Sequence, residues 1–239
     1  MPAKIEWKTA SEVKRLVVSD KEIGQGAFGT VYHGRIWFKG KKPLRVAVKK
    51  FHPGWQVTDE VIRAYRQTLE NLRRVGAPMP KVGFVKHEGN WVQVSAVYGA
   101  TARGSKFEPI LQFQPRRGNP TGFKMNSALK AHFNKEKNRR ELLDVIAKIT
   151  NAGILPAPDS INVVPTKTGK KIMVTDFDFY GMHFEKDREL TPDYSNHLTN
   201  WLHNVPGNLE ENIKLLKSKL TNEHAIKVLE KMERKTAAK

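Results

Sequence analysis

A glycine-rich run near the start of the chain decides the fold, and it reads Gly24-Gln25-Gly26-Ala27-Phe28-Gly29-Thr30-Val31. Strand-like sequences lie on both sides, so residues 17–24 and 29–37 are expected to be two strands joined by the glycines. Glycine lets a hairpin backbone approach a triphosphate closely, and the exposed amides can contact its oxygens. A dinucleotide-binding fold would need a helix directly after the glycines, and residues 32–35 do not have that pattern. The run therefore predicts a phosphate-binding hairpin.

The next expected strand, residues 44–51, contains a lysine pair that follows Val46-Ala47-Val48. Because successive strand residues face opposite ways, Lys49 shares a face with Ala47, and Lys50 points to the other side. An ammonium group beneath the glycines can hold the α- and β-phosphates of ATP. Lys49 is thus the predicted phosphate-binding cation, whereas Lys50 is expected to be solvated.

Two polar residues in the second half of the chain are expected to lie at the same end of a hairpin. Residues 162–165 and 171–176 are expected to form a hairpin that turns at Thr168-Gly169, which brings Asn162 and Asp176 to the same end. Mg²⁺ binds few protein oxygens and keeps water and phosphate oxygens in its other positions. An amide and a carboxylate that converge at one end of a sheet suit this ion.

The glycines, the lysine, the asparagine and the aspartate stand in the order found in the protein kinase superfamily, which the chain resembles over roughly residues 17–205. Asp176-Phe177-Asp178 takes the place of the family's Asp-Phe-Gly, and its second aspartate resembles aminoglycoside- and choline-kinase-like enzymes. The resemblance implies ATP and Mg²⁺ as cofactors, with the metal held by Asn162 and Asp176. The residues that it assigns to ATP binding are Gly24, Gly26, Gly29, Val31, Ala47, Lys49 and Glu70.

The general base is one point where the sequence departs from that family. Active members usually carry an Asp five residues before the metal-binding Asn, and this position is Ala157. Asp159 lies three residues before Asn162, so either the loop is shortened and Asp159 accepts the hydroxyl proton, or the chain has no general base. A base contributes typically ~10²–10⁴-fold to the rate, so its loss would slow the enzyme and could leave it nearly inactive. We take Asp159 and Lys49 as the catalytic residues.

The partner of Lys49 is a second departure. Active kinases pair this lysine with a helix glutamate, for which Glu70 is the nearest candidate and Glu60 a weaker one. The family spacing falls closer to Thr68, and two positions on a helix differ by about 200° in direction. A solvated charge is the competing interpretation of Glu70.

A third departure is the short stretch between Gly181 and Pro192, which contains no Ala-Pro-Glu and leaves little room for a phosphorylated activation segment. Such truncation resembles RIO-type kinases, small-molecule kinases and minimal bacterial effector kinases. The segment Gly76-Ala77-Pro78-Met79-Pro80 adds to the likeness with RIO and aminoglycoside kinases.

The charge balance points to a polyanionic partner. The chain has 42 Lys plus Arg against 24 Asp plus Glu, a net charge of +18 that is spread along its length. Nucleotides, RNA, DNA, anionic lipid and an acidic protein all fit this charge. The chain has no cysteine, no secretion signal at its start and no apolar stretch of about 18 residues, so we expect a cytoplasmic protein without a membrane span.

The expected fold is α+β and two-lobed, with a five-stranded antiparallel N-lobe and one main helix over residues 1–99, and a reduced helical C-lobe over residues 100–239. Residues 101–124 are expected to have little regular structure, and residues 235–239 to be disordered. The other expected elements are strands at 82–86 and 91–98 and helices at 9–16, 58–76, 142–152, 209–220 and 225–232, with a further helix starting at 192.

These patterns favour an ATP- and magnesium-dependent phosphotransferase, an atypical serine/threonine protein kinase. Three alternatives stay open. A pseudokinase that acts as a scaffold or nucleotide sensor is motivated by Ala157 and the poorly placed Glu70. A nucleic-acid-associated, RIO-like protein is motivated by the net charge, and a small-molecule kinase by the truncation after Gly181.

Overall fold

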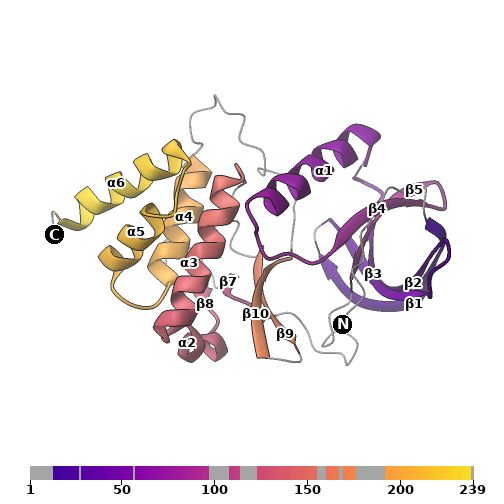
Figure 1. The fold of residues 1–239 in the computed structure, drawn as a ribbon, viewed down its shortest axis with the longest axis horizontal. Coiled ribbons are helices and arrows are strands. Elements are labelled where there is room, and N and C mark those ends of the chain that lie inside the picture. Colours follow the sequence, from indigo (N-terminus) through magenta and orange to yellow (C-terminus); the bar gives the residue numbers. More distant parts are fainter. Residues whose placement is uncertain are drawn as a thin grey trace. The chain divides into compact units, whose positions relative to one another are not determined.

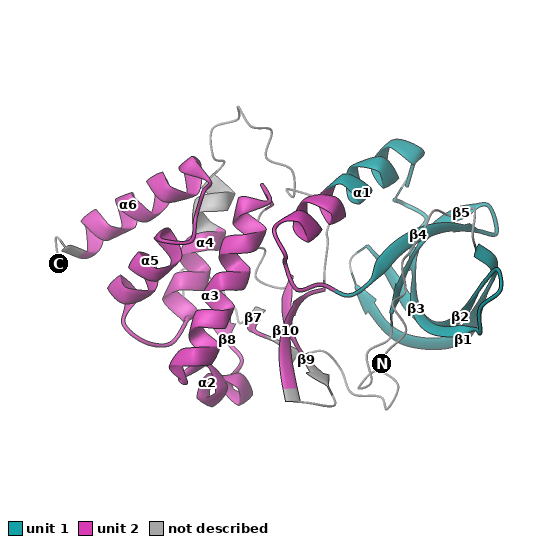
Figure 2. Cartoon of the chain, in the orientation of Figure 1, with its two compact units in different colours: residues 1–67, 80–106, 165–168 teal, residues 68–79, 107–164, 169–239 magenta. Residues whose placement is uncertain are grey.

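The computed structural model describes residues 13–26, 28–55, 57–96, 108–113, 123–154, 160–166, 169–175 and 192–237. Its fold is α+β, and the described residues include a five-stranded antiparallel sheet, two smaller sheets and six helices (Figure 1). They form two compact units (Figure 2). Unit 1 comprises residues 1–67, 80–106 and 165–168, and unit 2 comprises residues 68–79, 107–164 and 169–239. The expected lobe boundary at residues 99–100 lies outside the described residues and stays a prediction.

Unit 1 is built on the five-stranded sheet, whose strands lie in the order β1-β2-β3-β5-β4 and are antiparallel to their neighbours. The strands are β1 (Val13–Gly26), β2 (Gly29–Phe38), β3 (Leu44–Phe51), β4 (Val82–His87) and β5 (Asn90–Ala96). Val46 and Val48 are 1% and 0% exposed, while Ala47 and Lys49 are partly exposed, so the predicted alternation along β3 is confirmed. The buried face forms the unit 1 core of Ile36, Phe38, Val46, Val48, Val85, Val92 and Val94.

Helix α1 (Asp59–Arg74) confirms the helix expected at residues 58–76. The hydroxyl of Thr58 accepts a hydrogen bond from a first-turn amide at 3.4 Å, and acidic residues at the start and basic residues at the end suit the helix dipole. The ring of Tyr65 packs on Phe84 of β4, with 5.1 Å between the ring centroids. Gly76, with a φ of 67°, takes the left-handed conformation that ends many helices.

Unit 2 is mostly helical. Its complete helices are α2 (Ser127–Phe133), α3 (Glu136–Asn151), α4 (Pro192–Asn204), α5 (Leu209–Lys217) and α6 (Glu223–Ala237). Helix α3 contacts α2 and α5, and α5 also contacts α4 and α6. Leu142, Ile146, Trp201 and Leu216 are all 0% exposed, so these helices contribute side chains to the core of unit 2. None of the described helices combines the length and the apolar character needed to cross a lipid bilayer.

Two small sheets lie in unit 2, except that residues 165–166 of one strand belong to unit 1. Strand β9 (Ile161–Thr166) has β10 (Gly169–Val174) and β6 (Glu108–Pro109) as its hydrogen-bonded neighbours. Strand β7 (Leu111–Phe113) pairs with β8 (Phe123–Met125). The two strands expected over residues 162–176 are thereby confirmed as neighbours, and their turn at residues 167–168 lies outside the described residues.

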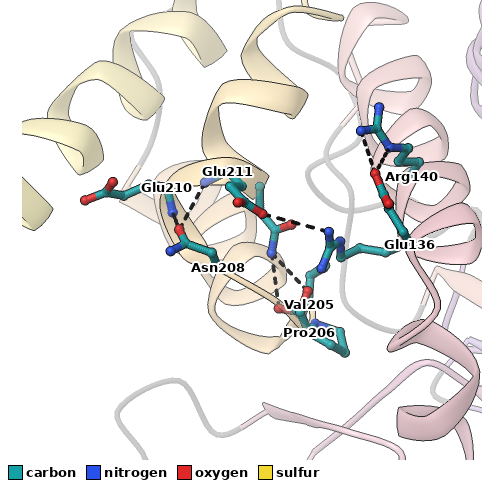
Figure 3. A network of polar contacts seen from close by, with 9 residues as sticks. Glu136, Arg140, Val205, Pro206, Asn208, Glu210 and Glu211 are labelled. Atoms are coloured by element: carbon teal, nitrogen blue, oxygen red, sulfur yellow. Dashed lines mark hydrogen bonds and ion pairs between the residues drawn. The ribbon is translucent and has the colours of Figure 1, made fainter.

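Polar contacts define where α5 begins (Figure 3). The side-chain oxygen of Asn208 accepts hydrogen bonds from the backbone amides of Glu210 at 2.8 Å and Glu211 at 3.2 Å, which caps the helix. The carboxylate of Glu211 also pairs with Arg139 of α3 at 4.0 Å. The helix start is therefore fixed both by its own cap and by a charge on the neighbouring helix.

The helix expected at residues 9–16 is wrong where the structure describes it, because residues 13–16 belong to β1. Val13 and Leu16 pack against the unit 1 core and pair with Phe38 and Ile36 at the far end of β2. A capping pattern is a local signal, and here it is outweighed by apolar burial that only the partner strand can supply. At the other end of the chain, α6 continues to Ala237, so residues 235–237 are helical and not disordered.

Residues 101–124 contain more regular structure than their glycine and proline content predicts. Strands β6 and β7 lie in this stretch, and β8 begins in it. Ile110 and Leu111 are 0% and 1% exposed, so the stretch contributes to the core of unit 2. Helix α3 also begins earlier than expected, at Glu136, and α2 was not expected.

Candidate nucleotide site

The glycine run forms the turn between β1 and β2. Gly24 pairs with Val31, and Gly26 pairs with Gly29, so the run continues the ladder almost to the tip of the hairpin. Ala27 lies outside the described residues. The strand–turn–strand predicted from the sequence is confirmed, and no helix follows the glycines.

The three glycines differ in how far packing explains them. At Gly29, a Cβ atom would overlap the backbone carbonyl oxygen of Lys50 and lie 3.1 Å from the Cα of Phe51 on β3. At Gly24 nothing lies within 4 Å of the Cβ position, and at Gly26 the nearest atom is 4.0 Å away. None of the three has a positive φ. Packing therefore explains Gly29, while the open space at Gly24 and Gly26 leaves room for a ligand to approach the backbone.

Strand register aligns Lys49 with the glycine turn. Gly24 pairs with Val31 on β2, Val31 with Lys49 on β3, and Lys49 with Gln93 on β5. Directly paired residues project from the same face of a sheet. Since neighbouring strands are about 4.8 Å apart, the Cα atom of Lys49 is roughly 10 Å from that of Gly24. Ala47 is two residues before Lys49 and lies on the same face.

The two adjacent lysines of β3 have different surroundings. The Nζ atom of Lys49 lies 5.7 Å from the centre of the Phe28 ring, which belongs to the glycine turn. The Nζ atom of Lys50, on the opposite face, lies 5.7 Å from the Tyr32 ring and 3.8 Å from the carboxylate of Glu88. The side chain of Lys50 is 41% exposed, so it is partly solvated as expected, but it also has an ion-pair partner. Lys49 is the lysine that contacts the turn.

The segment after β3 also holds the glycine turn, which sequence reasoning did not predict. The Nε2 atom of His52 donates a hydrogen bond to the carbonyl oxygen of Gly26 at 3.0 Å. The backbone amide of His52 donates a second one to the carbonyl oxygen of Phe28 at 3.1 Å. The ring of Trp55 lies 4.7 Å from the Phe28 ring. The signal in the sequence was a turn-like His-Pro-Gly-Trp directly after the lysine strand.

A pocket of about 440 Å³ in unit 1 is lined by residues of the segment that holds the glycine turn, but not by the glycines themselves. Its lining includes Lys50, Trp55 and Trp91, and none of the predicted site residues. At its edge the carboxylate of Asp59 accepts a hydrogen bond from Nε1 of Trp91 at 2.7 Å and pairs with Lys86 at 3.4 Å. The Trp91 hydrogen bond and then the Lys86 charge lower the pKa of Asp59.

In unit 2, Asn162 is a buried polar residue on β9, with 7% of its surface exposed. Its Nδ2 atom donates a hydrogen bond to the hydroxyl of Thr175 at 2.5 Å, and the amide of Thr175 donates to the carbonyl of Ser160 at 2.9 Å. These bonds tie Asn162 to the residue directly before Asp176. An amide oxygen is a ligand type that Mg²⁺ accepts, so the side chain present fits the predicted metal site. Asp176 and Asp159 lie outside the described residues, and their roles stay predictions.

Glu70 lies on the exposed side of α1, whereas Thr68 lies on its buried side. Thr68 is 2% exposed and shares the buried side with Tyr65 and Leu72. Glu70 belongs to unit 2 and Lys49 to unit 1, so the predicted pairing of their side chains stays a prediction.

The segment after α1 is joined to β10. The carbonyl oxygen of Pro78 accepts a hydrogen bond from the amide of Val174 at 2.8 Å. Pro78 therefore contacts the strand that precedes Asp176 in the sequence.

The candidate site residues that the structure describes thus fall into two groups. Strand pairing brings together the glycines of the 24–29 run, Val31, Ala47 and Lys49 in unit 1. Hydrogen bonding places Asn162 beside Thr175 in unit 2. No protein-family model matches the chain, and no curated protein matches it.

Proposed function

We propose that the chain is an ATP- and magnesium-dependent phosphotransferase with a two-lobed, protein-kinase-like fold, and more specifically an atypical serine/threonine protein kinase. The observation that supports this is the row of Gly24, Val31 and Lys49 across three neighbouring strands. It adjoins a turn in which packing requires neither Gly24 nor Gly26. Accessible backbone amides with an ammonium group nearby suit a triphosphate.

Each group has its own task in the proposed reaction. The glycines of the 24–29 run cover the phosphates, and Lys49 holds the α- and β-phosphates. Asn162 and Asp176 would hold Mg²⁺, which supplies positive charge to the phosphate oxygens. A substrate hydroxyl oxygen bonds to the γ-phosphorus while the bond from that phosphorus to the β–γ bridging oxygen breaks. Asp159 would accept the proton that the hydroxyl loses.

Lys49→Ala and Lys50→Ala form a matched pair for testing the nucleotide site, because the two lysines are adjacent and face opposite ways. A charge-assisted contact is worth about 1.5–3 kcal/mol, so Lys49→Ala is expected to weaken binding of a fluorescent ATP analogue with Mg²⁺ by at least about tenfold. Lys50→Ala is expected to change the affinity by less than about threefold. Unchanged binding by Lys49→Ala, or an equal loss in both variants, would contradict the proposal.

Transfer is measured separately with radiolabelled ATP. Asp176→Ala is expected to abolish magnesium-dependent labelling of the protein or of a serine/threonine substrate. Asp159→Ala is expected to lower the rate by about 10²–10⁴-fold. Magnesium-dependent ATP binding by the wild type with no labelled product would instead favour the pseudokinase, which Ala157 motivates.

A further inference from the structure

A basic patch lies on the same sheet face as Lys49, toward the other end of the strands. We define it as Arg15 and Val17 on β1, Arg35 and Trp37 on β2, and Arg45 on β3. Strand register pairs Arg15 with Trp37, Val17 with Arg35, and Arg35 with Arg45. Directly paired residues project on one side of a sheet, so these side chains are neighbours.

The patch is open to solvent. Its three arginines are exposed, and Val17, at 38%, is the one exposed large apolar side chain in the part of the chain that the structure describes. Within that same part, no carboxylate forms an ion pair with any of the three arginines. The lysines of the β2–β3 turn add further exposed positive charge at this end, and they are Lys39, Lys41 and Lys42.

The pairing of Arg35 with Arg45 is unfavourable for the fold by itself. The Cβ atoms of directly opposite residues are about 5 Å apart, and like charges at that position destabilise a sheet. The side chains are exposed and contribute no burial to the unit 1 core. Residues that destabilise the fold locally are found mostly at positions where function requires them. An external anion that bridges the guanidinium groups would turn this repulsion into attraction.

The aromatic member of the patch indicates which anion fits. The guanidinium of Arg15 lies 5.4 Å from the centre of the Trp37 ring, so a planar cation and an aromatic ring are adjacent on the surface. Nucleic-acid bases stack on both kinds of group, while neighbouring arginines contact the phosphates. An anionic membrane would call for several exposed apolar side chains, and Val17 is the one that the described residues offer.

We propose that the basic patch binds single-stranded nucleic acid, with Arg35 and Arg45 contacting phosphates and Arg15 and Trp37 stacking against a base. The patch does not depend on the proposed phosphotransferase activity. Arg45 is four residues before Lys49, which corresponds to about 13 Å along β3. A polynucleotide on the patch would therefore be held close to the proposed ATP site without occupying it.

The test is fluorescence anisotropy with a labelled oligouridine of about 12 nucleotides, titrated between about 50 and about 400 mM salt. The variant carries Arg15→Gln, Arg35→Gln and Arg45→Gln together. Its charge-matched control carries Lys137→Gln, Lys214→Gln and Lys227→Gln, which remove the same charge from exposed helix positions of unit 2. The DNA oligonucleotide of matching sequence distinguishes RNA from DNA, and binding of either supports the proposal.

The patch variant is expected to bind at least about tenfold more weakly than the wild type at low salt. Its slope of log affinity against log salt is expected to be less steep by about 1.4, because the variant loses two phosphate contacts and each accounts for about 0.7. The control is expected to change affinity by less than about threefold. Equal weakening of both variants would overturn the proposal, since net charge alone would then explain binding.

Two further outcomes would also overturn it. One is the absence of binding to either oligonucleotide at low salt. The other is patch-dependent binding to vesicles containing phosphatidylserine, or to polyglutamate, without binding to nucleic acid. Thermal unfolding of each variant tests whether a loss of binding comes from misfolding. Because Arg35→Gln relieves the repulsion by Arg45, we expect it to leave the melting temperature unchanged or raise it by about 1 °C.

Discussion

Alanine in place of each glycine of the 24–29 run would separate the glycine that the sheet needs from those that a ligand needs. A Cβ atom at Gly29 overlaps the carbonyl oxygen of Lys50, and the obstacle is backbone, which cannot move aside as a flexible side chain can. At Gly24 and Gly26 the Cβ position is open, and neither residue has a positive φ. The same substitution therefore meets opposite environments within a few residues.

The size of the effect follows from two opposing terms. Overpacking of this kind costs typically ~1–3 kcal/mol, because β2 and β3 have to shift apart. Alanine also restricts the unfolded chain, which stabilises the protein by about 0.4–1 kcal/mol where its backbone conformation is allowed. For Gly29→Ala the net loss is about 1–2 kcal/mol, or a melting temperature lower by roughly 2–8 °C. For Gly24→Ala and Gly26→Ala only the second term applies, so the melting temperature should stay the same or rise slightly.

Thermal unfolding followed by circular dichroism measures how much each substitution changes stability. Titration with an ATP analogue measures how much it changes nucleotide binding. Gly24→Ala and Gly26→Ala are expected to keep the fold and to weaken ATP binding, since a methyl group would lie where phosphate approaches the backbone. A Gly29→Ala protein as stable as the wild type would refute the packing argument. Stable Gly24→Ala and Gly26→Ala proteins that bind ATP normally would refute the ligand argument.

Three other predictions concern unit 2. Leu142→Ala, at a side chain that is 0% exposed, is expected to cost about 2–5 kcal/mol of unfolding free energy in a denaturant titration. Asn208→Ala removes the cap of α5 and is expected to cost about 1 kcal/mol in the same titration. Asp144 pairs with Lys148 at 2.9 Å and Lys219 at 3.1 Å, so Asp144→Asn is expected to cost about 1 kcal/mol at neutral pH. Partial burial opposes ionisation of Asp144, but the two lysines outweigh it and lower its pKa below the ordinary 3.8.

The sign of the pH dependence follows from that lowered pKa. A carboxyl group whose folded-state pKa is depressed stabilises the protein above its unfolded pKa, and this stabilisation is lost as the pH falls through the folded pKa. The stability gap between the wild type and Asp144→Asn should therefore be full at neutral pH and close as the pH falls below the ordinary 3.8 and through the lowered folded-state pKa. A gap that stays constant over that range would show that the ion pairs do not contribute.

For Asn208, the matched control is Asn208→Asp, which keeps the capping oxygen and should retain most of the stability.

Sequence reasoning succeeded where the signal is local. The alternation of Val46, Ala47, Val48 and Lys49 correctly assigned the faces of β3, and the glycine run correctly predicted a hairpin. Features that depend on a distant partner could not be read in this way. The start of β1 at Val13 is set by pairing with β2, and the contact of His52 with Gly26 spans 26 positions.

The same distinction between local and distant signals applies to the candidate site. The alignment of Lys49 with Gly24 requires the register of three strands, which spacing along the chain does not fix. The link between Asn162 and Thr175 likewise depends on two segments meeting through a hydrogen bond. The opposition of Arg35 and Arg45 becomes visible only once β2 and β3 are paired.

Helix α1 has a consequence for any attempt to divide the protein. Residues up to 67 belong to unit 1, whereas residues 68–79 belong to unit 2, where Pro78 bonds to Val174 of β10. The chain then returns to unit 1 at residue 80. A fragment ending at residue 99 would include residues 68–79 of unit 2. The remaining fragment would lack Pro78, whose carbonyl oxygen accepts the hydrogen bond from Val174 of β10. The halves of this chain are interleaved, and neither can be excised by a single cut.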